Sequence, residues 1–217
     1  MSFKLSCRVV ETSLTSFDSI FYATLAMSFT PPMVSTAPRT WKRDNSKFFI
    51  STDQSLLSIK AVNEAYGREF LYWAKPFEED VLRQMLYGCM SFGVYQSQKE
   101  HEPPSAENTE QIGLARMITD GVTFGYLTDV YVLPEYQGHG LGRWLLECVS
   151  EVFSKENMPH LRRNMLLTSD DKMQNFYADI FDTMKVVGRE ERKDIGRDLV
   201  FMCARPGVKP DPSTALE

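Results

Sequence analysis

The feature that most constrains the fold is a glycine-rich turn between an expected strand and an expected helix. The strand ends in Val130-Tyr131-Val132, Pro134 breaks it, and the run Gln137-Gly138-His139-Gly140-Leu141-Gly142 follows. Glycine permits tight turns in which backbone amides approach a ligand and point inward. A helix N-terminus behind such a turn adds partial positive charge. The turn therefore predicts an anion site suited to a pyrophosphate, and a glycine-rich connection without a ligand is the alternative.

The helix after the turn is predicted by its apolar spacing. Apolar side chains recur at every third or fourth position between Leu141 and Phe153. A dinucleotide fingerprint that begins at Gly138 would need glycine or alanine where Arg143 stands. A Walker loop would need Gly-Lys-Ser/Thr, which the sequence lacks. Neither of these two phosphate motifs accounts for the turn.

The residues Gln137-x-x-Gly140-x-Gly142 match the Gln/Arg-x-x-Gly-x-Gly/Ala signature of the GNAT superfamily of acetyl-CoA-dependent N-acetyltransferases. The sequence resembles this family from about residue 48 to residue 203, including the order strand, proline, signature loop, long helix, strand and tyrosine-bearing helix. The resemblance implies an α/β (α+β) fold with a mixed, mostly antiparallel central sheet. About six or seven strands and about four flanking helices are expected. It also implies transfer of the acetyl group of acetyl-CoA to a primary amine, by direct attack in a ternary complex.

The same resemblance implies where acetyl-CoA binds as co-substrate. Its pantetheine arm is expected to pair with the main chain of the strand, and its pyrophosphate with the loop amides and Arg143. The residues expected at the coenzyme are Val130, Tyr131, Val132, Gln137, Gly138, His139, Gly140, Leu141, Gly142 and Arg143.

Two catalytic residues are expected. Tyr177 stands where relatives often carry the general acid, although the Gly-Phe pair common there is here replaced at residues 180–182. Proton transfer from a phenol of pKa about 10 to a thiolate of pKa about 8.5 is slightly unfavourable but feasible. Asp129 interrupts an apolar strand, and burial would suit a carboxylate to proton abstraction. A core role for Tyr177, a hydrogen bond from Asp129 to a neighbouring turn, and water as the base are the alternatives.

The acceptor pocket is expected to be lined by Tyr72, Trp73, Phe92 and Arg116. The Tyr-Trp pair follows the first expected helix, in the region that borders the acceptor site in the family. The alternative for the aromatic residues of this set is a place in the hydrophobic core. The alternative functions are a catalytically silent acyl-CoA-binding domain and a protein lysine or N-terminal acetyltransferase.

Composition excludes several classes of protein. A net charge of −5 and a pI near 5.4 disfavour nucleic acid as a partner. No stretch approaches the ~20 apolar residues that span a bilayer, so no membrane association is expected. The 4 cysteines lie far apart, and none of the 3 histidines has metal-ligand spacing. We therefore expect no metal and a reducing, cytoplasmic compartment. The expected partner is a small amine, and the expected state a monomer or homodimer.

The expected domain covers residues 48–203, with a polar insertion at residues 96–111 and a disordered tail from residue 204 to 217. Residues 1–47 are interpreted as a disordered leader, because Ser and Thr are frequent and three prolines interrupt any helix. A mitochondrial targeting segment is the alternative. Asp53 or Ser55 is expected to cap the first helix, and Pro76 to open the second.

Overall fold

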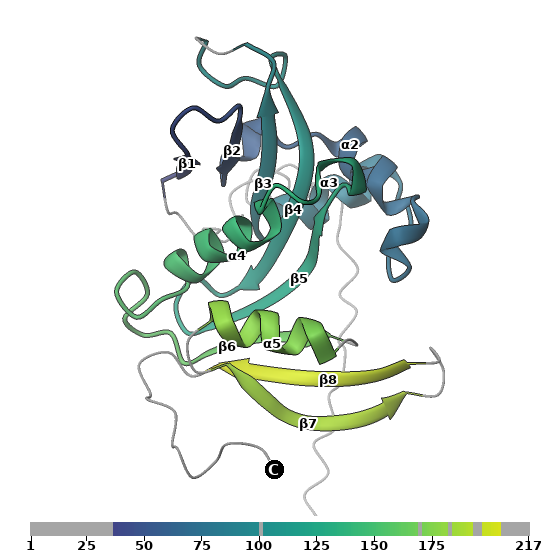
Figure 1. The fold of residues 1–217 in the computed structure, drawn as a ribbon, viewed down its shortest axis with the longest axis vertical. Helices are drawn as coiled ribbons and strands as arrows, with labels where there is room; N and C mark the ends of the chain where they lie inside the picture. The colour runs from purple at the N-terminus through teal and green to yellow at the C-terminus, as the bar shows by residue number, and fades with distance from the viewer. Residues whose placement is uncertain (1–36, 100–101, 169–170, 182–183, 193–196, 205–217) are drawn as a thin grey trace, which may run out of the picture. The chain divides into compact units, whose positions relative to one another are not determined.

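A computed structural model describes residues 37–99, 102–168, 171–181, 184–192 and 197–204, with side chains up to Met184. It contains an 8-stranded sheet in the order β1-β2-β3-β4-β5-β6-β8-β7 (Figure 1). All neighbours are antiparallel except β5 and β6. The strands are β1 (Thr40–Lys42), β2 (Phe48–Ser51), β3 (Met90–Ser97), β4 (Thr109–Thr119), β5 (Phe124–Val132), β6 (Arg163–Thr168), β7 (Lys185–Arg192) and β8 (Arg197–Ala204). The predicted mixed, mostly antiparallel sheet is confirmed, with one strand more than expected.

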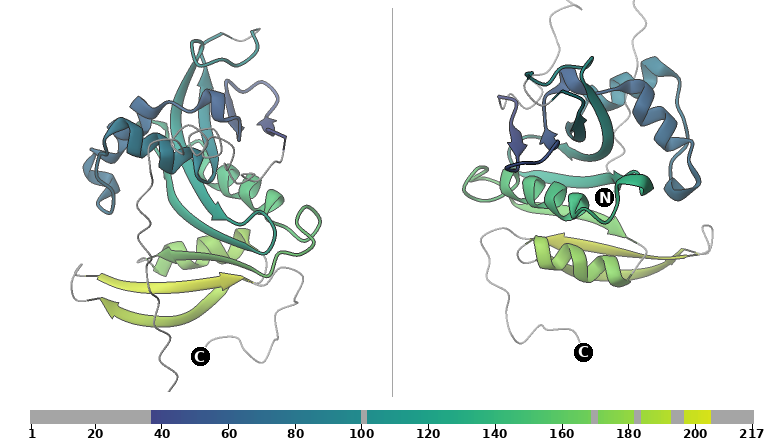
Figure 2. Two further views of the ribbon diagram at one scale, coloured as in Figure 1. Left: turned by 180° about the vertical axis from the view of Figure 1, so that it is seen from behind. Right: turned by 45° about the horizontal axis from the view of Figure 1, so that its top comes forward.

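Helices cover both faces of the central strands β3–β5 (Figures 1 and 2). The helices of the described residues are α2 (Ile59–Tyr66), α3 (Glu79–Tyr87), α4 (Leu141–Val152) and α5 (Asp171–Ile180). Short 3-10 turns occupy Gln54–Leu56, Glu69–Leu71 and Pro134–Tyr136. None of the helices described here is long and apolar enough to cross a bilayer.

The alternation of strand residues explains this two-sided arrangement. Leu114 on β4 and Tyr131 on β5 pack with α2 and α3 in one apolar cluster. Their neighbours Ala115 and Val132 point to the opposite face and pack with α4 in the other cluster. Successive side chains of a strand point to opposite faces, so a central strand with apolar residues on both faces requires helices on both.

The parallel pairing of β5 with β6 is short. It runs from Phe124 opposite Arg163 to Leu127 opposite Leu166, and it ends there. Beyond this point β5 continues to Val132 without β6, while β6 pairs with β8 as far as Thr168. The two strands therefore diverge, and the second half of β5 keeps a free edge toward β6.

The segment interpreted as a leader contributes a strand, which corrects the predicted boundary at residue 47. Thr40, Trp41 and Lys42 form β1 and pair with β2. The Trp41 ring stacks on Phe92 with centroids 6.0 Å apart, and its indole N–H donates to Glu151 at 2.9 Å. Residues 37–47 therefore belong to the domain. Residues 1–36 and the expected tail from residue 205 lie outside the described residues.

Trp41→Ala is expected to lower the free energy of unfolding by about 2 kcal/mol, because it uncovers the apolar surface around Phe92. Lys42→Ala, at the next and exposed position of β1, is the control and should cost less than about 0.5 kcal/mol. Deleting residues 1–46 should cost at least as much as Trp41→Ala. Equal urea midpoints for the Trp41 and Lys42 variants would contradict this packing role.

Two helix starts differ from the prediction. Ser58, not Asp53 or Ser55, caps α2, since its hydroxyl accepts the Ala61 N–H at 3.2 Å. Asp53 instead caps the preceding 3-10 turn. Pro76 lies outside α3, whose N-cap is Glu78. The paired strands β3 and β4 end and begin at Ser97 and Thr109, inside the bounds of 96–111 predicted for the polar insertion.

Candidate active site

A β-bulge shapes the centre of the candidate site. Leu114 lies opposite Tyr131 and Arg116 opposite Thr128, so two residues of β5 face Ala115 alone. One of the two, Asp129, has a φ of 49°, in the left-handed region that aspartate tolerates better than most residues. A bulge bends its strand and increases the local twist. The bend begins two residues after Leu127, the last residue of β5 that pairs with β6.

An ion pair spans this bulge. The Nε atom of Arg116 donates to Oδ2 of Asp129 at 2.6 Å, and its Nη2 atom lies 2.6 Å from the same oxygen. The two side chains are only 9% and 11% exposed. Arg116 also donates to the sulfur of Cys89 at 3.5 Å. Burial, and then the charge of Asp129, raise the pKa of nearby Tyr66. The expected base and the expected acceptor-binding arginine are therefore partners of each other.

Asp129→Asn is expected to lower the free energy of unfolding by about 3–5 kcal/mol, because it leaves the Arg116 charge enclosed without a counter-charge. Asparagine also tolerates a positive φ, so the loss reports charge rather than backbone strain. Adding Arg116→Met should recover at least half of the loss, as a double-mutant cycle in urea would show. Full stability with slowed turnover in Asp129→Asn would instead support the base role.

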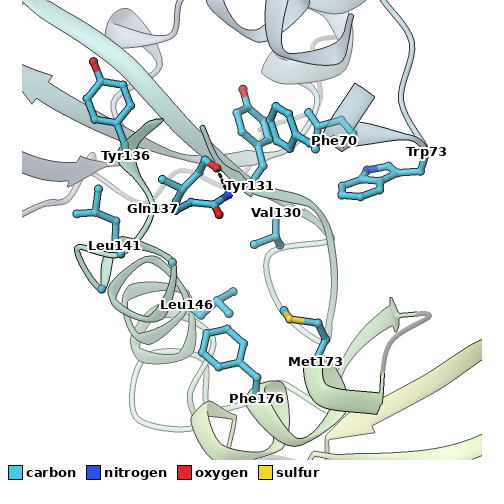
Figure 3. A pocket seen from close by; sticks show the side chains of 15 residues that line it. Phe70, Trp73, Val130, Tyr131, Tyr136, Gln137, Leu141, Leu146, Met173 and Phe176 are labelled. Atoms are coloured by element: carbon cyan, nitrogen blue, oxygen red, sulfur yellow. Dashed lines mark hydrogen bonds between the residues drawn. The ribbon is translucent and has the colours of Figure 1, made fainter. Parts of the chain in front are cut away.

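A pocket of about 430 Å³ lies where β5 leaves β6 (Figure 3). Its wall is built from β5, the glycine-rich loop, the first two turns of α4, one face of α5 and the segment after α2. None of its lining residues carries a charged side chain; they are Phe70, Leu71, Trp73, Val130, Tyr131, Val132, Tyr136, Gln137, Gly138, Gly140, Leu141, Gly142, Leu146, Met173 and Phe176.

The loop forms an uncapped helix start. Gly138 and Gly140 have φ values of 84° and 70°, which glycine adopts without steric cost. Gly140 is the N-cap of α4, and within the described part of the chain this helix start has no side-chain cap hydrogen bond. A Cβ atom added at Gly138, Gly140 or Gly142 would meet nothing within 4 Å. The side-chain amide of Gln137 donates to the Val132 carbonyl at 3.0 Å and ties the loop to β5. The amides at the start of α4 are thus open to an anion.

Two of the expected coenzyme residues lie elsewhere. Arg143 forms ion pairs with Asp179 on α5 and with Glu147, the latter at 3.9 Å, and does not line the pocket. Exposed His139 has its Nδ1 atom 3.2 Å from the carbonyl oxygens of Tyr136 and Gln137. The expectation that Arg143 holds the pyrophosphate is therefore not supported by its position. The other eight expected residues do line the pocket.

Tyr177 is 8% exposed and packs in the apolar cluster under α4. Burial raises its pKa to about 12. Phe176, one position earlier on α5, lines the pocket, whereas Tyr177 does not. No described residue forms a hydrogen bond with the Tyr177 hydroxyl. The acid role of Tyr177 stays a prediction.

The expected acceptor residues separate into three environments. Trp73 lines the pocket and is 50% exposed, and Tyr72 packs edge-on against it without lining the pocket. Phe92 is fully buried beneath Trp41, so its prediction as an acceptor contact is wrong. Arg116 is enclosed in its ion pair. Phe70 and Met173 also line the pocket, although neither was among the predicted site residues.

Within the described residues, no group of three or more His, Cys, Asp and Glu side chains could hold a metal ion.

The acetyltransferase (GNAT) domain family matches residues 105–180, which include β5, the loop and α4. The chain is 43% identical over 166 residues to a Gibberella zeae protein named "Putative acetyltransferase FG08082", covering 70% of this chain and 91% of that protein.

Two solved structures share the fold. One is spermidine N-acetyltransferase from Vibrio cholerae in complex with CoA and spermine, with a TM-score of 0.53 and 17% identity, over 74% of this chain and 96% of that chain. The other is ribosomal-protein-S5-alanine acetyltransferase from Vibrio fischeri, with a TM-score of 0.54 and 13% identity, over 80% and 100% of the two chains. The family match and the close relative, together with this fold, show that the chain belongs to the GNAT family of acetyltransferases.

Proposed function

We propose that the protein transfers the acetyl group of acetyl-CoA to the nitrogen of a small primary amine, by direct attack. The observation that carries the proposal is the meeting of two features in one pocket: the free edge of β5 and the uncapped, glycine-rich start of α4. Each supplies backbone groups that need a partner.

These residues fit the coenzyme. Peptide groups of residues 130–132 have no β6 partner and can pair with the amides of a pantetheine arm, as a further strand would. The amides that begin α4 suit a pyrophosphate. Leu146, Met173 and Phe176 give an apolar wall to the channel between them.

Acetyl-CoA supplies a thioester carbon to which the amine nitrogen bonds as the carbon–sulfur bond breaks. The protein mainly has to hold the reactants in line, which can account for a large part of the barrier reduction. In this proposal the Tyr177 hydroxyl, one residue from the pocket wall, donates a proton to the departing sulfur. The proton that the nitrogen loses passes to water, because the nearest β5 carboxylate, Asp129, is already paired.

The test is a thiol-release assay with acetyl-CoA and a panel of primary amines, run beside calorimetry with CoA. We expect CoA binding and amine-dependent release of free thiol. Binding with no release for any amine would favour a silent acyl-CoA-binding domain. Labelled acetyl transfer to peptides alone would favour a protein acetyltransferase.

A further inference from the structure

The pocket has two chemically different ends. At one end the loop around Gln137 and the start of α4 present backbone amides, and at the other Phe70, Trp73 and Tyr131 present aromatic rings (Figure 3). Val130 lies between the two ends. If the amide end takes the pyrophosphate and β5 the pantetheine arm, the aromatic end is left for the acceptor.

We infer that the acceptor is a primary amine that carries an aromatic or similarly apolar group, held against Phe70 and Trp73. The inference rests on the proposed function and narrows its substrate class. The Phe70 ring is braced edge-on by Tyr131, with centroids 6.2 Å apart. Trp73 lines the pocket yet stays 50% exposed. An aromatic ligand would cover this ring, and an aromatic pair contributes beyond the area that it buries.

The charges around this end disfavour polyamines and basic peptides. The pocket wall itself contains no acidic residue, and Glu69, next to Phe70 in the chain, does not line it. Two other acidic neighbours are already paired, Asp129 with Arg116 at 2.6 Å and Glu135 with Arg68 at 2.8 Å. The Arg68 guanidinium also lies 5.4 Å from the Phe70 ring centroid. A second ammonium group would therefore find no free carboxylate in the pocket wall, and a cation already beside the ring.

The same environment activates an apolar amine. An apolar wall disfavours the charged form of a buried amine, and only the neutral form has the lone pair that attacks a thioester. Desolvation can thus favour the neutral amine, a task that we expected a carboxylate base to perform. This explains how the reaction proceeds although Asp129 is neutralised by Arg116.

The experiment compares 2-phenylethylamine with spermidine as acceptors for the wild-type chain and three variants. Wild-type kcat/KM should be at least tenfold higher for 2-phenylethylamine. Trp73→Ala should lower that kcat/KM about tenfold, through the amine KM and with the acetyl-CoA KM unchanged, and Trp73→Phe should restore most of it. Phe77→Ala removes another exposed aromatic ring, 42% exposed and outside the pocket wall, and should change kcat/KM less than twofold.

Higher kcat/KM for spermidine, or equal effects of Trp73→Ala and Phe77→Ala, would overturn the inference while leaving acetyl transfer in place. CoA binding with neither amine acetylated would also overturn it. Absence of CoA binding in calorimetry would instead refute the proposed function itself.

Discussion

Gly140→Asp is expected to weaken CoA binding about 10³-fold in a chain that remains folded. A carboxylate at the N-cap of α4 would face the bound pyrophosphate. Two unit charges 4 Å apart repel by about 4 kcal/mol at an effective dielectric constant of 20. Gly140 has a φ of 70°, and a new Cβ atom would meet nothing within 4 Å. Aspartate tolerates this backbone region better than most residues, so the fold should survive.

Gly140→Asn is the matched control, because it has the same shape and the same tolerance of a positive φ without the charge. Calorimetry with CoA on both folded variants separates the effect of the added charge on CoA affinity from the effect of the added side-chain volume. We expect a loss of less than about tenfold for asparagine, since only the added side chain has to be accommodated. Unchanged CoA affinity in Gly140→Asp would show that the pyrophosphate does not bind at this loop.

Tyr177→Phe is expected to lower kcat about 10²–10⁴-fold, the usual contribution of a positioned general acid. The ring of Tyr177 packs beneath α4, and phenylalanine preserves that packing. The hydroxyl has no hydrogen bond to a described residue, so its removal should change the free energy of unfolding by less than about 1 kcal/mol. The acetyl-CoA KM should change little, because the loop is untouched.

Tyr126→Phe removes a hydroxyl from β5 outside the pocket wall and should leave kcat near the wild-type value. The pH profile adds a second test. With the pKa of Tyr177 raised to about 12, its ionisation should not reduce kcat below about pH 10. Wild-type kcat in Tyr177→Phe would leave solvent as the proton source for the leaving thiolate.

Much of the fold and of the coenzyme half of the site follows from local sequence. The turn from Gln137 to Gly142 and the apolar spacing of α4 are properties of contiguous residues, and the structure shows both. The pairing of Arg116 with Asp129 depends instead on a one-residue register shift between two strands. The residue spacing within a single strand does not reveal such a shift. An aspartate in an apolar strand does indicate which position of the strand is unusual.

Long-range packing accounts for contacts that local sequence did not reveal. Phe92 looked like a pocket residue because its partner Trp41, 51 positions earlier, lay in a polar segment without strand-like alternation. The ion pair of Arg143 with Asp179 likewise joins two separate helices. In both cases the deciding contact joins elements whose proximity the sequence pattern does not encode.

The strand order also fixes a sequence of events during synthesis. β8 lies between β6 and β7 in the sheet although both precede it in the chain. A nascent chain that has released β6 and β7 but not residues 197–204 therefore has nothing to join these two strands. During that interval the β6 edge is open to pairing with other chains. The pairing of β6 with β8 has to wait until residues 197–204 have left the ribosome.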